Sequence, residues 1–351
     1  MKGLILCAGR GTRLRPLTYS QPKPLLPVAN KPVLVYALEQ LARTGIEEIG
    51  IVINPFQEGI IRHHIRMAKP RNVSVTMIHQ ERPRGIADAV RQAEDFIGQD
   101  RFLLLLGDNL IQQSLNGLKQ DIRQSGRNGS ILLARVNNPR EYGIASIEGD
   151  RIVRLEEKPI SPRSNLAVIG AYAFDSRIFT AIHQISPSAR GEYEITDAIQ
   201  WMIDHEGSIS YSLTDQHYSD VGTVSRWLEA NHWKLNELSA GRSMIDPTST
   251  VKDCTIIDPV IIGEGCTLVE STIGPYVSME AGVKVDRCRI RNSILLEKAQ
   301  LERISTPIDR SVFGRHVRVG CPASDEASGR FILGDGSSIY LHPGELGSGK
   351  Q

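Results

Sequence analysis

Aliphatic residues recur at every fifth or sixth position after Met244, and this repeat constrains the fold more than any other feature of the 351-residue sequence. A parallel β-helix produces such a period because each short strand turns one aliphatic side chain toward the axis of the coil. We therefore predict a parallel β-helix over residues 245–340. The residues in register are Ile262, Leu268, Ile273, Met279, Val285 and Ile290, with Val312, Val317 and Val319 as candidates for its continuation and 332–336 as a candidate last rung.

The sequence before Met244 is organised differently, because apolar runs of strand length alternate with segments whose apolar residues have helical spacing. This alternation predicts crossover connections, a doubly wound α/β domain over residues 1–240, and ligand binding at the carboxyl ends of the strands. A closing helix is predicted for 223–238, and Asn231 interrupts its apolar stripe. The runs that predict strands are 48–53, 73–78 and 102–106, and those that predict helices are 33–42 and 87–97.

The first apolar run, Leu4–Cys7, leads into a loop of small residues and cations, Ala8–Arg13. Successive N–H groups of a glycine-containing loop form an anion-binding concavity, and arginine donates two parallel hydrogen bonds to a phosphate. The loop lacks the third glycine of the dinucleotide-binding pattern and the Gly-Lys-Ser/Thr ending of the ATPase phosphate loop. We therefore predict a triphosphate cradle of another kind, to which Arg10, Arg13 and Arg15 add positive charge.

A second motif, Pro22–Pro27, follows this loop and holds Lys23 between two prolines. Together, L-x-A-G-x-G-T-R-L and P-K-P-L-L-P-V-A-N-K-P resemble the sugar-1-phosphate nucleotidyltransferases, and the resemblance extends over essentially the whole chain. It is closest to the long-form glucose-1-phosphate thymidylyltransferases. Two positions depart from the pattern, because Ala8 replaces a glycine and Pro24 replaces the glutamine of this subgroup. The second change also occurs in mannose-1-phosphate guanylyltransferases, so UTP and GTP stay open as alternatives to dTTP.

The resemblance implies a nucleotidyltransferase domain built on a doubly wound mixed sheet, followed by a left-handed parallel β-helix. The implied reaction is Mg²⁺-dependent transfer of a thymidylyl group from dTTP to glucose 1-phosphate, which gives dTDP-glucose and pyrophosphate. Hexapeptide β-helices often bind acyl-coenzyme A, so a bifunctional enzyme with a C-terminal acetyltransferase is an alternative. Beyond His316 the coil offers no convincing catalytic histidine, and we expect it to assemble a homo-oligomer.

Such a reaction brings two anions together, so cations and a divalent metal are expected to matter more than a protein nucleophile. Arg13 and Lys23 match the family motif and are the candidates for neutralising the triphosphate. Gln80 and Gly85 resemble the family's base-reading loop, in which an amide donates to and accepts from a pyrimidine edge. The predicted nucleotide-binding residues are Ala8, Gly9, Gly11, Thr12, Arg13, Lys23, Gln80, Gly85 and Asp108, of which Arg13, Lys23 and Asp108 are predicted to be catalytic.

Two aspartates are predicted to bind Mg²⁺. Asp108 follows an entirely apolar strand, so it emerges at a carboxyl end, where ligands bind. Asp220 lies in a D-x-G-T sequence that resembles the position of the second metal ligand in the family. Carboxylates together with phosphate oxygens are ligands that suit Mg²⁺. From the residues alone, each aspartate is also a candidate cap for a helix that follows it.

The sugar phosphate is expected to bind on short segments that match the family. The resemblance implies that the glutamate of E-K-P, Glu157, accepts sugar hydroxyls and that Lys158 holds the sugar phosphate. The segment 188–197 also matches the subgroup, but we interpret it as a structural loop that enters a helix, and its Glu194 and Asp197 are not predicted to bind metal. The predicted sugar-phosphate residues are Tyr142, Gly143, Glu157, Lys158 and Val168.

Composition restricts the partners and the compartment. The chain has 41 Lys and Arg against 40 Asp and Glu, a net charge of +1, which argues against nucleic-acid binding or a polybasic membrane anchor. Five cysteines without a C-x-x-C pair indicate reduced thiols. No signal peptide or membrane-spanning run is visible, because the longest apolar runs have the length of a strand. We expect a cytoplasmic protein without a nucleic-acid or membrane partner.

Overall fold

The computed structural model describes residues 1–124, 126–320 and 338. The chain forms two compact units, and the N-terminal segment contributes to both of them. The first unit consists of Met1–Arg10, Pro22–Leu25 and Pro32–Asp220, and the second of Gly11–Gln21, Leu26–Lys31 and Val221–Gln351. Domain limits at 240 and 245 stay a prediction, and the end of the predicted coil, with the candidate rung at 332–336, lies outside the described residues.

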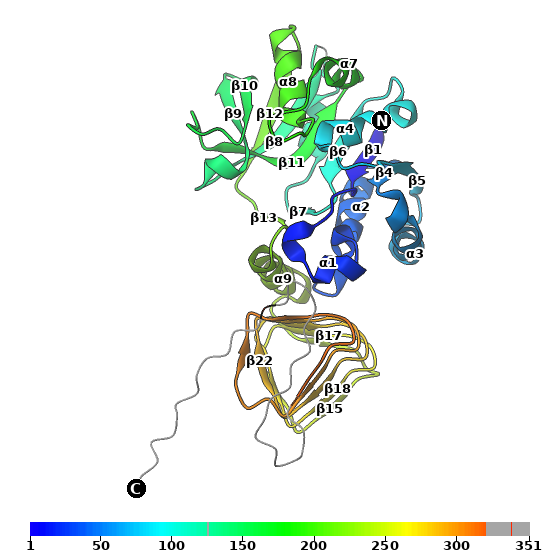
Figure 1. Ribbon diagram of the computed structural model, residues 1–351, viewed down its shortest axis with the longest axis vertical. Helices are drawn as coiled ribbons and strands as arrows, with labels where there is room; N and C mark the ends of the chain where they lie inside the picture. Colours follow the sequence, from blue (N-terminus) through cyan, green and yellow to red (C-terminus); the bar gives the residue numbers. More distant parts are fainter. Residues whose placement is uncertain (125, 321–337, 339–351) are drawn as a thin grey trace. The chain divides into compact units, whose positions relative to one another are not determined.

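A nine-stranded sheet forms the centre of the first unit, in the order β5-β4-β1-β6-β11-β8-β12-β10-β9 (Figure 1). Strands β5, β4, β1 and β6 run parallel, as the alternation of strands and helices predicts. Strand β11 is antiparallel to β6 and to β8, so the whole sheet is mixed. The strands are β1 (Lys2–Leu6), β4 (Glu48–Ile53), β5 (Ser74–His79), β6 (Phe102–Leu106), β8 (Gly129–Arg135), β9 (Gly143–Glu148), β10 (Arg151–Glu157), β11 (Leu166–Phe174) and β12 (Ile209–Thr214), and shorter pairs are formed by β2 (Pro27–Val28) with β3 (Lys31–Pro32) and by β7 (Asn109–Ile111) with β13 (Tyr218–Asp220).

Helices cover both faces of this sheet, because successive side chains of a strand point to opposite sides. Leu4 and Leu104 lie in one buried cluster, and Ile5 and Leu105 lie in the other. Helices α4, α7 and α8 contribute to the first cluster, and α2, α3 and α6 contribute to the second. The helices are α1 (Leu17–Ser20), α2 (Val33–Arg43), α3 (Glu58–Ala68), α4 (Ile86–Arg91), α5 (Glu94–Ile97), α6 (Asn116–Asp121), α7 (Arg177–Gln184), α8 (Ile195–Asp204) and α9 (Val224–Ser239).

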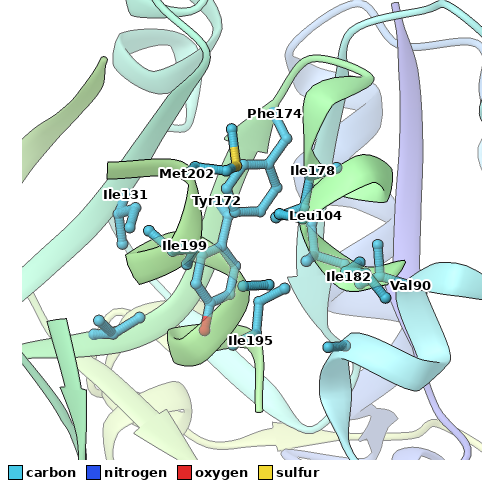
Figure 2. Packing of buried hydrophobic residues seen from close by; sticks show 14 of the residues in the cluster. Val90, Leu104, Ile131, Tyr172, Phe174, Ile178, Ile182, Ile195, Ile199 and Met202 are labelled. Atoms are coloured by element: carbon cyan, nitrogen blue, oxygen red, sulfur yellow. The ribbon is translucent and has the colours of Figure 1, made fainter. Parts of the chain in front are cut away.

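Aromatic residues of β11 fill the middle of the first cluster. Figure 2 shows Tyr172 and Phe174 among apolar side chains of α7 and α8, including Ile178 and Met202. The rings of Tyr172 and Phe174 stack with their centroids 5.7 Å apart. This cluster therefore joins the parallel and antiparallel parts of the sheet into one core.

One predicted helix is divided in the structure. Residues 87–97 form α4 and α5, which are separated at Gln92 and Ala93. The N–H of Ala93 donates to the carbonyl of Val90 at 2.9 Å. This bond spans three residues, as in a 3-10 helix, and the first α-helix ends there. Ala93 and Ile97 are both buried in the core, which explains why the apolar spacing alone predicts a single continuous helix.

The second unit contains a coil of short parallel strands in three sheets, with the orders β14-β17-β20-β23-β26, β15-β18-β21-β24-β27 and β16-β19-β22-β25. The six residues predicted to face its axis are all exposed by 2% or less, so the prediction of a parallel β-helix is confirmed at these positions. Val312 lies in β26 and Val319 in β27. The strands are β14 (Met244–Ile245), β15 (Thr250–Lys252), β16 (Thr255–Ile256), β17 (Val260–Ile262), β18 (Thr267–Val269), β19 (Thr272–Ile273), β20 (Val277–Met279), β21 (Lys284–Asp286), β22 (Arg289–Arg291), β23 (Ile294–Leu295), β24 (Gln300–Glu302), β25 (Ile308–Asp309), β26 (Val312–Phe313) and β27 (Arg318–Gly320).

The described part of the chain contains no helix that is both long enough and apolar enough to cross a membrane. Its cysteines, Cys7, Cys254, Cys266 and Cys288, form no disulfide. Three of them are buried, and two of these, Cys266 and Cys288, are part of the core of the coil.

The six residues that face the axis of the coil, called here the inward column, lead to a prediction about stability. Leu268 is fully buried on β18, and the preceding Thr267 on the same strand is partly exposed. Leu268→Ala should lower the free energy of unfolding by about 2–5 kcal/mol, because it leaves a cavity between stacked rungs. Thr267→Ala is the matched control and should cost less than about 1 kcal/mol. Urea unfolding followed by circular dichroism measures both, and equal effects of the two substitutions would contradict the assignment of the inward column.

Candidate active site

The predicted nucleotide loops begin where the parallel strands end. After β1, the N–H of Cys7 donates to the carbonyl of Val52 in β4 at 2.7 Å. After β6, the N–H of Gly107 donates to the carbonyl of Leu6 at 2.9 Å. The segments that follow β1 and β6 therefore leave the same edge of the sheet side by side, as the crossover topology requires.

The glycine loop has the open form expected of an anion-binding loop. Gly9 and Arg10 are exposed, and within the described residues a Cβ on Gly9 would meet no atom within 4 Å beyond its chain neighbours. Within the second unit, Gly11 has a positive φ of 61° and precedes a short 3-10 helix at Thr12–Leu14. Its carbonyl accepts a hydrogen bond from the Thr18 hydroxyl at 2.8 Å, which fixes the turn. Thr12 and Arg13 are both exposed on this turn, and Ala8 is buried before it.

Lys23 and Asp108 form an ion pair in the first unit. The Lys23 Nζ donates to Asp108 Oδ2, and the side chains are 11% and 27% exposed. Lys23 lies in a 3-10 helix at Lys23–Leu25, where the flanking prolines restrict the backbone. Burial, and then the charge of Asp108, raises the pKa of the Cys7 thiol, which also places Asp108 close to the end of β1. Two of the three residues predicted to be catalytic are therefore in contact.

The second predicted metal ligand is brought to the same edge by a two-stranded ribbon. Strand β13 pairs with β7 in antiparallel register, and Asp220 lies opposite Asn109, the residue after Asp108. Neither aspartate caps a helix: Asp108 is followed by strand β7, and the cap of α9 is Thr223, whose side chain accepts the Arg226 N–H at 3.3 Å. The alternative interpretation of both aspartates as caps is therefore removed.

The described residues contain no group of three or more His, Cys, Asp or Glu side chains arranged to hold a metal ion. A metal site formed by Asp108 and Asp220 therefore stays a prediction. Mg²⁺ commonly binds to one or two carboxylates from the protein and takes its remaining ligands from phosphates and water.

Hydrogen bonds within the predicted base-reading loop fix its conformation. Gln80 is 4% exposed, and its Nε2 donates to Asp88 Oδ2 at 2.7 Å and to the Gly85 carbonyl at 3.3 Å. Gly85 has a φ of 106°, and a Cβ there would lie 2.5 Å from the Tyr193 carbonyl oxygen. No other residue fits this position without moving the backbone, because both the conformation and the close approach require glycine. The loop brings Gln80 and Gly85 together, as the sequence predicts.

The predicted sugar-phosphate residues gather at the end of β10. Glu157 lies opposite Gly143 across the β9–β10 pair, and the Lys158 N–H donates to the Tyr142 carbonyl at 3.0 Å. A Cβ on Gly143 would lie 3.3 Å from Glu157 Oε2 and 3.8 Å from Val168 Cγ2. The five predicted residues are therefore close neighbours, although they come from three separate segments of the chain.

Sequence reasoning missed part of this cluster, because it assigned 188–197 a structural role alone. Arg190 Nη2 donates to Glu157 Oε1 at 3.1 Å and to Glu194 Oε1 at 2.8 Å. The Thr196 hydroxyl donates to Glu157 Oε2 at 3.3 Å. The spacing of Arg190 and Glu194 is the signal that was available, since residues four apart commonly pair, but nothing in the sequence connects them to Glu157.

Electrostatics distinguishes Glu157 from the surface carboxylates. Burial, followed by the neighbouring charge of Glu194, raises the pKa of Glu157, although Lys158 and Arg190 act in the opposite direction. Burial and Glu194 also raise the pKa of Asp197. Glu157 is therefore a partly buried carboxylate. Arg190 and the Thr196 hydroxyl donate to its two oxygens, and the Lys158 Nζ lies 3.8 Å from Oε1. A carboxylate in such a place suits an acceptor for ligand hydroxyl groups.

Known proteins match the part of the chain that contains all of these residues. The pattern of a family described as nucleotidyl transferase matches residues 2–237. A Streptomyces griseus protein named glucose-1-phosphate thymidylyltransferase is 34% identical over 355 aligned residues, covering 97% of this chain and 99% of the relative.

Two solved structures extend the comparison. One, from Bacillus anthracis and described as a glucose-1-phosphate thymidylyltransferase in complex with sucrose, is 35% identical, has a TM-score of 0.62 and covers 66% of this chain and 94% of that chain. The other is a UDP-glucose pyrophosphorylase complexed with UDP-glucose, which is 25% identical, has a TM-score of 0.61 and covers 67% of this chain and 98% of that chain. The fold is therefore shared by proteins named for different nucleotides.

The raised pKa of Glu157 predicts a pH-dependent effect of its substitution. A carboxyl whose pKa is higher in the fold than in the unfolded chain stabilises the fold below the unfolded pKa of about 4.3, and this contribution is lost as the pH rises through the folded pKa. Glu157→Gln removes the titration and keeps the size. The melting temperature of the variant minus that of the wild type should therefore rise between about pH 4 and pH 7. Calorimetry at several pH values measures the difference, and a constant or falling difference would contradict the assignment.

Proposed function

Because the chain belongs to the nucleotidyl transferase family, we propose that it is a sugar-1-phosphate nucleotidyltransferase, and specifically a glucose-1-phosphate thymidylyltransferase. The observation that carries the proposal is the ion pair of Lys23 and Asp108 at the carboxyl edge of the sheet, next to the ribbon that carries Asp220. A cation and two carboxylates at that edge are what a triphosphate and its metal require.

The nucleotide would bind along the edge formed by the ends of β1, β5 and β6. Backbone N–H groups of the loop from Ala8 through Gly9, Gly11 and Thr12 would donate to phosphate oxygens. Arg13 and Lys23 would neutralise the triphosphate and the charge that develops on the leaving pyrophosphate. Gln80 and Gly85 would read the base, Gln80 through its amide oxygen, because its Nε2 donates to Asp88 and to the Gly85 carbonyl, and Gly85 through the close approach of its backbone.

Asp108 and Asp220 fit a magnesium site, because their carboxylates are hard oxygen donors that leave room for phosphate ligands. Mg²⁺ bound there would supply charge neutralisation to the phosphates. The contact of Lys23 with Asp108 gives each charged group a partner of opposite sign in the structure. In the substrate complex, Lys23 would contact the phosphates and Asp108 would bind the metal.

The sugar phosphate would bind at the end of β10. Glu157 would accept hydrogen bonds from sugar hydroxyls, and Lys158 would hold the phosphate by its charge. Tyr142, Gly143 and Val168 would shape the pocket, and the close approach of Gly143 to Glu157 supports this. Arg190 would hold Glu157 in place through their 3.1 Å hydrogen bond.

The proposed chemistry is one displacement at phosphorus. An oxygen of the sugar phosphate attacks the α-phosphorus of dTTP, a new P–O bond forms, and the bond to the β-phosphate oxygen breaks. The products are dTDP-glucose and pyrophosphate, and the negative charge that develops on the leaving oxygen departs with the pyrophosphate. The protein contributes position and charge to this step, because neither substrate needs a covalent intermediate.

Several finer features belong to the same proposal. We propose that the β-helix is left-handed, that it assembles a homo-oligomer and that the protein works in the cytoplasm. Free thiols support the last point, since the described cysteines form no disulfides. An acetyltransferase activity of the coil is the alternative, and His316 is exposed there with its backbone N–H on the Glu297 carbonyl at 2.9 Å.

The test is the rate of pyrophosphate release with dTTP, UTP, GTP or ATP, each combined with glucose, galactose, mannose or N-acetylglucosamine 1-phosphate. We expect dTTP with glucose 1-phosphate to have the highest kcat/KM, and we expect removal of Mg²⁺ by chelation to abolish release until Mg²⁺ is restored. A preference for UTP or GTP would replace the proposed nucleotide and keep the chemistry. Acetyl transfer from acetyl-coenzyme A to an aminosugar phosphate would show a second active site.

A further inference from the structure

A buried carboxylate lies behind the side chain of Gln80. Asp88, in the first turn of α4, is 3% exposed, and its Oδ2 accepts the Gln80 Nε2 at 2.7 Å. Its other oxygen accepts a hydrogen bond from Arg91, which forms an ion pair with it on the same helix. Burying a charge costs free energy unless a partner of opposite sign and hydrogen bonds compensate for it. Asp88 has both, the charge of Arg91 and the hydrogen bond of Gln80.

The Arg91 side chain is itself held in place. Its guanidinium carbon lies 5.5 Å from the centroid of the Tyr193 ring, a distance at which the ring attracts the cation. The backbone of Tyr193 also bonds to this loop, because its N–H donates to the Arg84 carbonyl at 2.7 Å and its carbonyl accepts the Ala87 N–H at 3.0 Å. All of these residues belong to the first unit. Arg91 therefore holds one oxygen of Asp88 and leaves the other for the amide.

This carboxylate decides which end of the Gln80 amide faces inward. A carboxylate paired with an arginine only accepts hydrogen bonds, so the NH₂ group of the amide must be the end that points at Asp88. A second acceptor, the Gly85 carbonyl, lies 3.3 Å from the same nitrogen. An amide nitrogen carries two hydrogens, and each of them has an acceptor here. Gln80 can therefore offer a ligand only its oxygen, Oε1.

The Gln80 oxygen is available to a donor. Within the described part of the chain, both printed hydrogen bonds of Gln80 run through its nitrogen. The fully enclosed side-chain oxygens that lack a partner there belong to Asn30 and Gln57, so Oε1 of Gln80 is not sealed inside the protein. An acceptor with a fixed orientation discriminates strongly, because a ligand that presents another acceptor leaves both groups without a hydrogen bond.

We propose that Asp88 is a specificity-determining residue: by holding the NH₂ group of Gln80, it gives the base site an acceptor that takes only bases with a ring N–H. Thymine and uracil offer the N3–H, and guanine offers the N1–H. Cytosine and adenine have a lone pair on the matching nitrogen and are excluded. The inference rests on the proposed placement of the base at Gln80, and it leaves the choice among thymine, uracil and guanine to other contacts.

UTP and CTP are the matched probes, because their bases have the same size and differ at N3 and at the neighbouring exocyclic group. In the wild type with Mg²⁺, the calorimetric Kd of CTP should be about tenfold to a hundredfold higher than that of UTP, since CTP leaves the Gln80 oxygen without a donor. A wild type that binds CTP as tightly as UTP would overturn the proposal.

Asp88→Asn keeps the shape and should allow the Gln80 amide to turn. Arg91 has only donors, so it should hold the oxygen of the new amide, whose NH₂ group then faces Gln80 and favours the opposite orientation there. The Kd of CTP divided by that of UTP should fall by about tenfold. Complete reversal is not expected, because the Gly85 carbonyl still favours the original orientation.

The matched control is Asp95→Asn, at an exposed aspartate of α5, which should leave the ratio of the two Kd values unchanged. Equal weakening of UTP and CTP binding in Asp88→Asn would show that Asp88 only supports the loop, and it would overturn the proposal. An Asp88→Asn ratio equal to that of Asp95→Asn would overturn it as well.

A stability measurement keeps the test independent of the proposed function. Gln80→Glu places a second carboxylate against Asp88, and two like charges at this distance repel. It should lower Tm by about 3 °C or more in the wild type and by much less in an Asp88→Asn background. Equal Tm shifts in the two backgrounds would show that Asp88 does not hold the amide.

Two further outcomes are separated by these measurements. If Asp88→Asn does not fold, Gln80→Glu is compared with the neutral Gln80→Met, and an equal Tm of these two variants would overturn the proposal. If the wild type bound none of dTTP, UTP and GTP, the proposed function would fail, and the Tm shifts would still decide whether Asp88 fixes the amide of Gln80.

Discussion

The ion pair of Lys23 and Asp108 is the contact on which the proposed active site depends. It joins a proline-restricted loop near the N-terminus to the end of a buried strand far along the sequence. Removing one partner of a partly buried pair leaves the other charge without compensation, so the loop is held firmly while substrates are absent. A triphosphate would pair with Lys23, and its metal would pair with Asp108. The two residues that bind each other without substrate are therefore already placed to bind these two charged ligands.

Within the second unit, buried hydrogen bonds join segments that are far apart in the sequence. The segment after Lys23 belongs to that unit, and Asn231, Trp227 and Asn30 fix it against α9 and the coil. A β-helix is stiff because every rung is hydrogen-bonded to the next one. The apolar repeat that defines the coil therefore gives the second unit a rigid frame against which this segment is held.

Much of this could be predicted from sequence, because the strongest signals are local. The inward residues of the coil repeat at short spacing, and Asp108 follows an apolar strand, so both could be placed without knowledge of long-range contacts. The contacts of Arg190 with Glu157 and of Asn231 with Ala29 could not, because they join segments that the sequence separates widely. The break between α4 and α5 was hidden for another reason, since the apolar spacing continues through it.

The proposed nucleotide site contains Lys23, and the proposed sugar-phosphate site contains Lys158. The most direct measurement is the calorimetric Kd of dTTP with Mg²⁺, in the absence of sugar phosphate, for the wild type, Lys23→Met and Lys158→Met. Methionine keeps most of the apolar stem and removes the charge. We predict that Lys23→Met weakens binding by about tenfold or more and that Lys158→Met leaves the Kd unchanged. Loss of dTTP affinity in Lys158→Met, with normal affinity in Lys23→Met, would contradict the account.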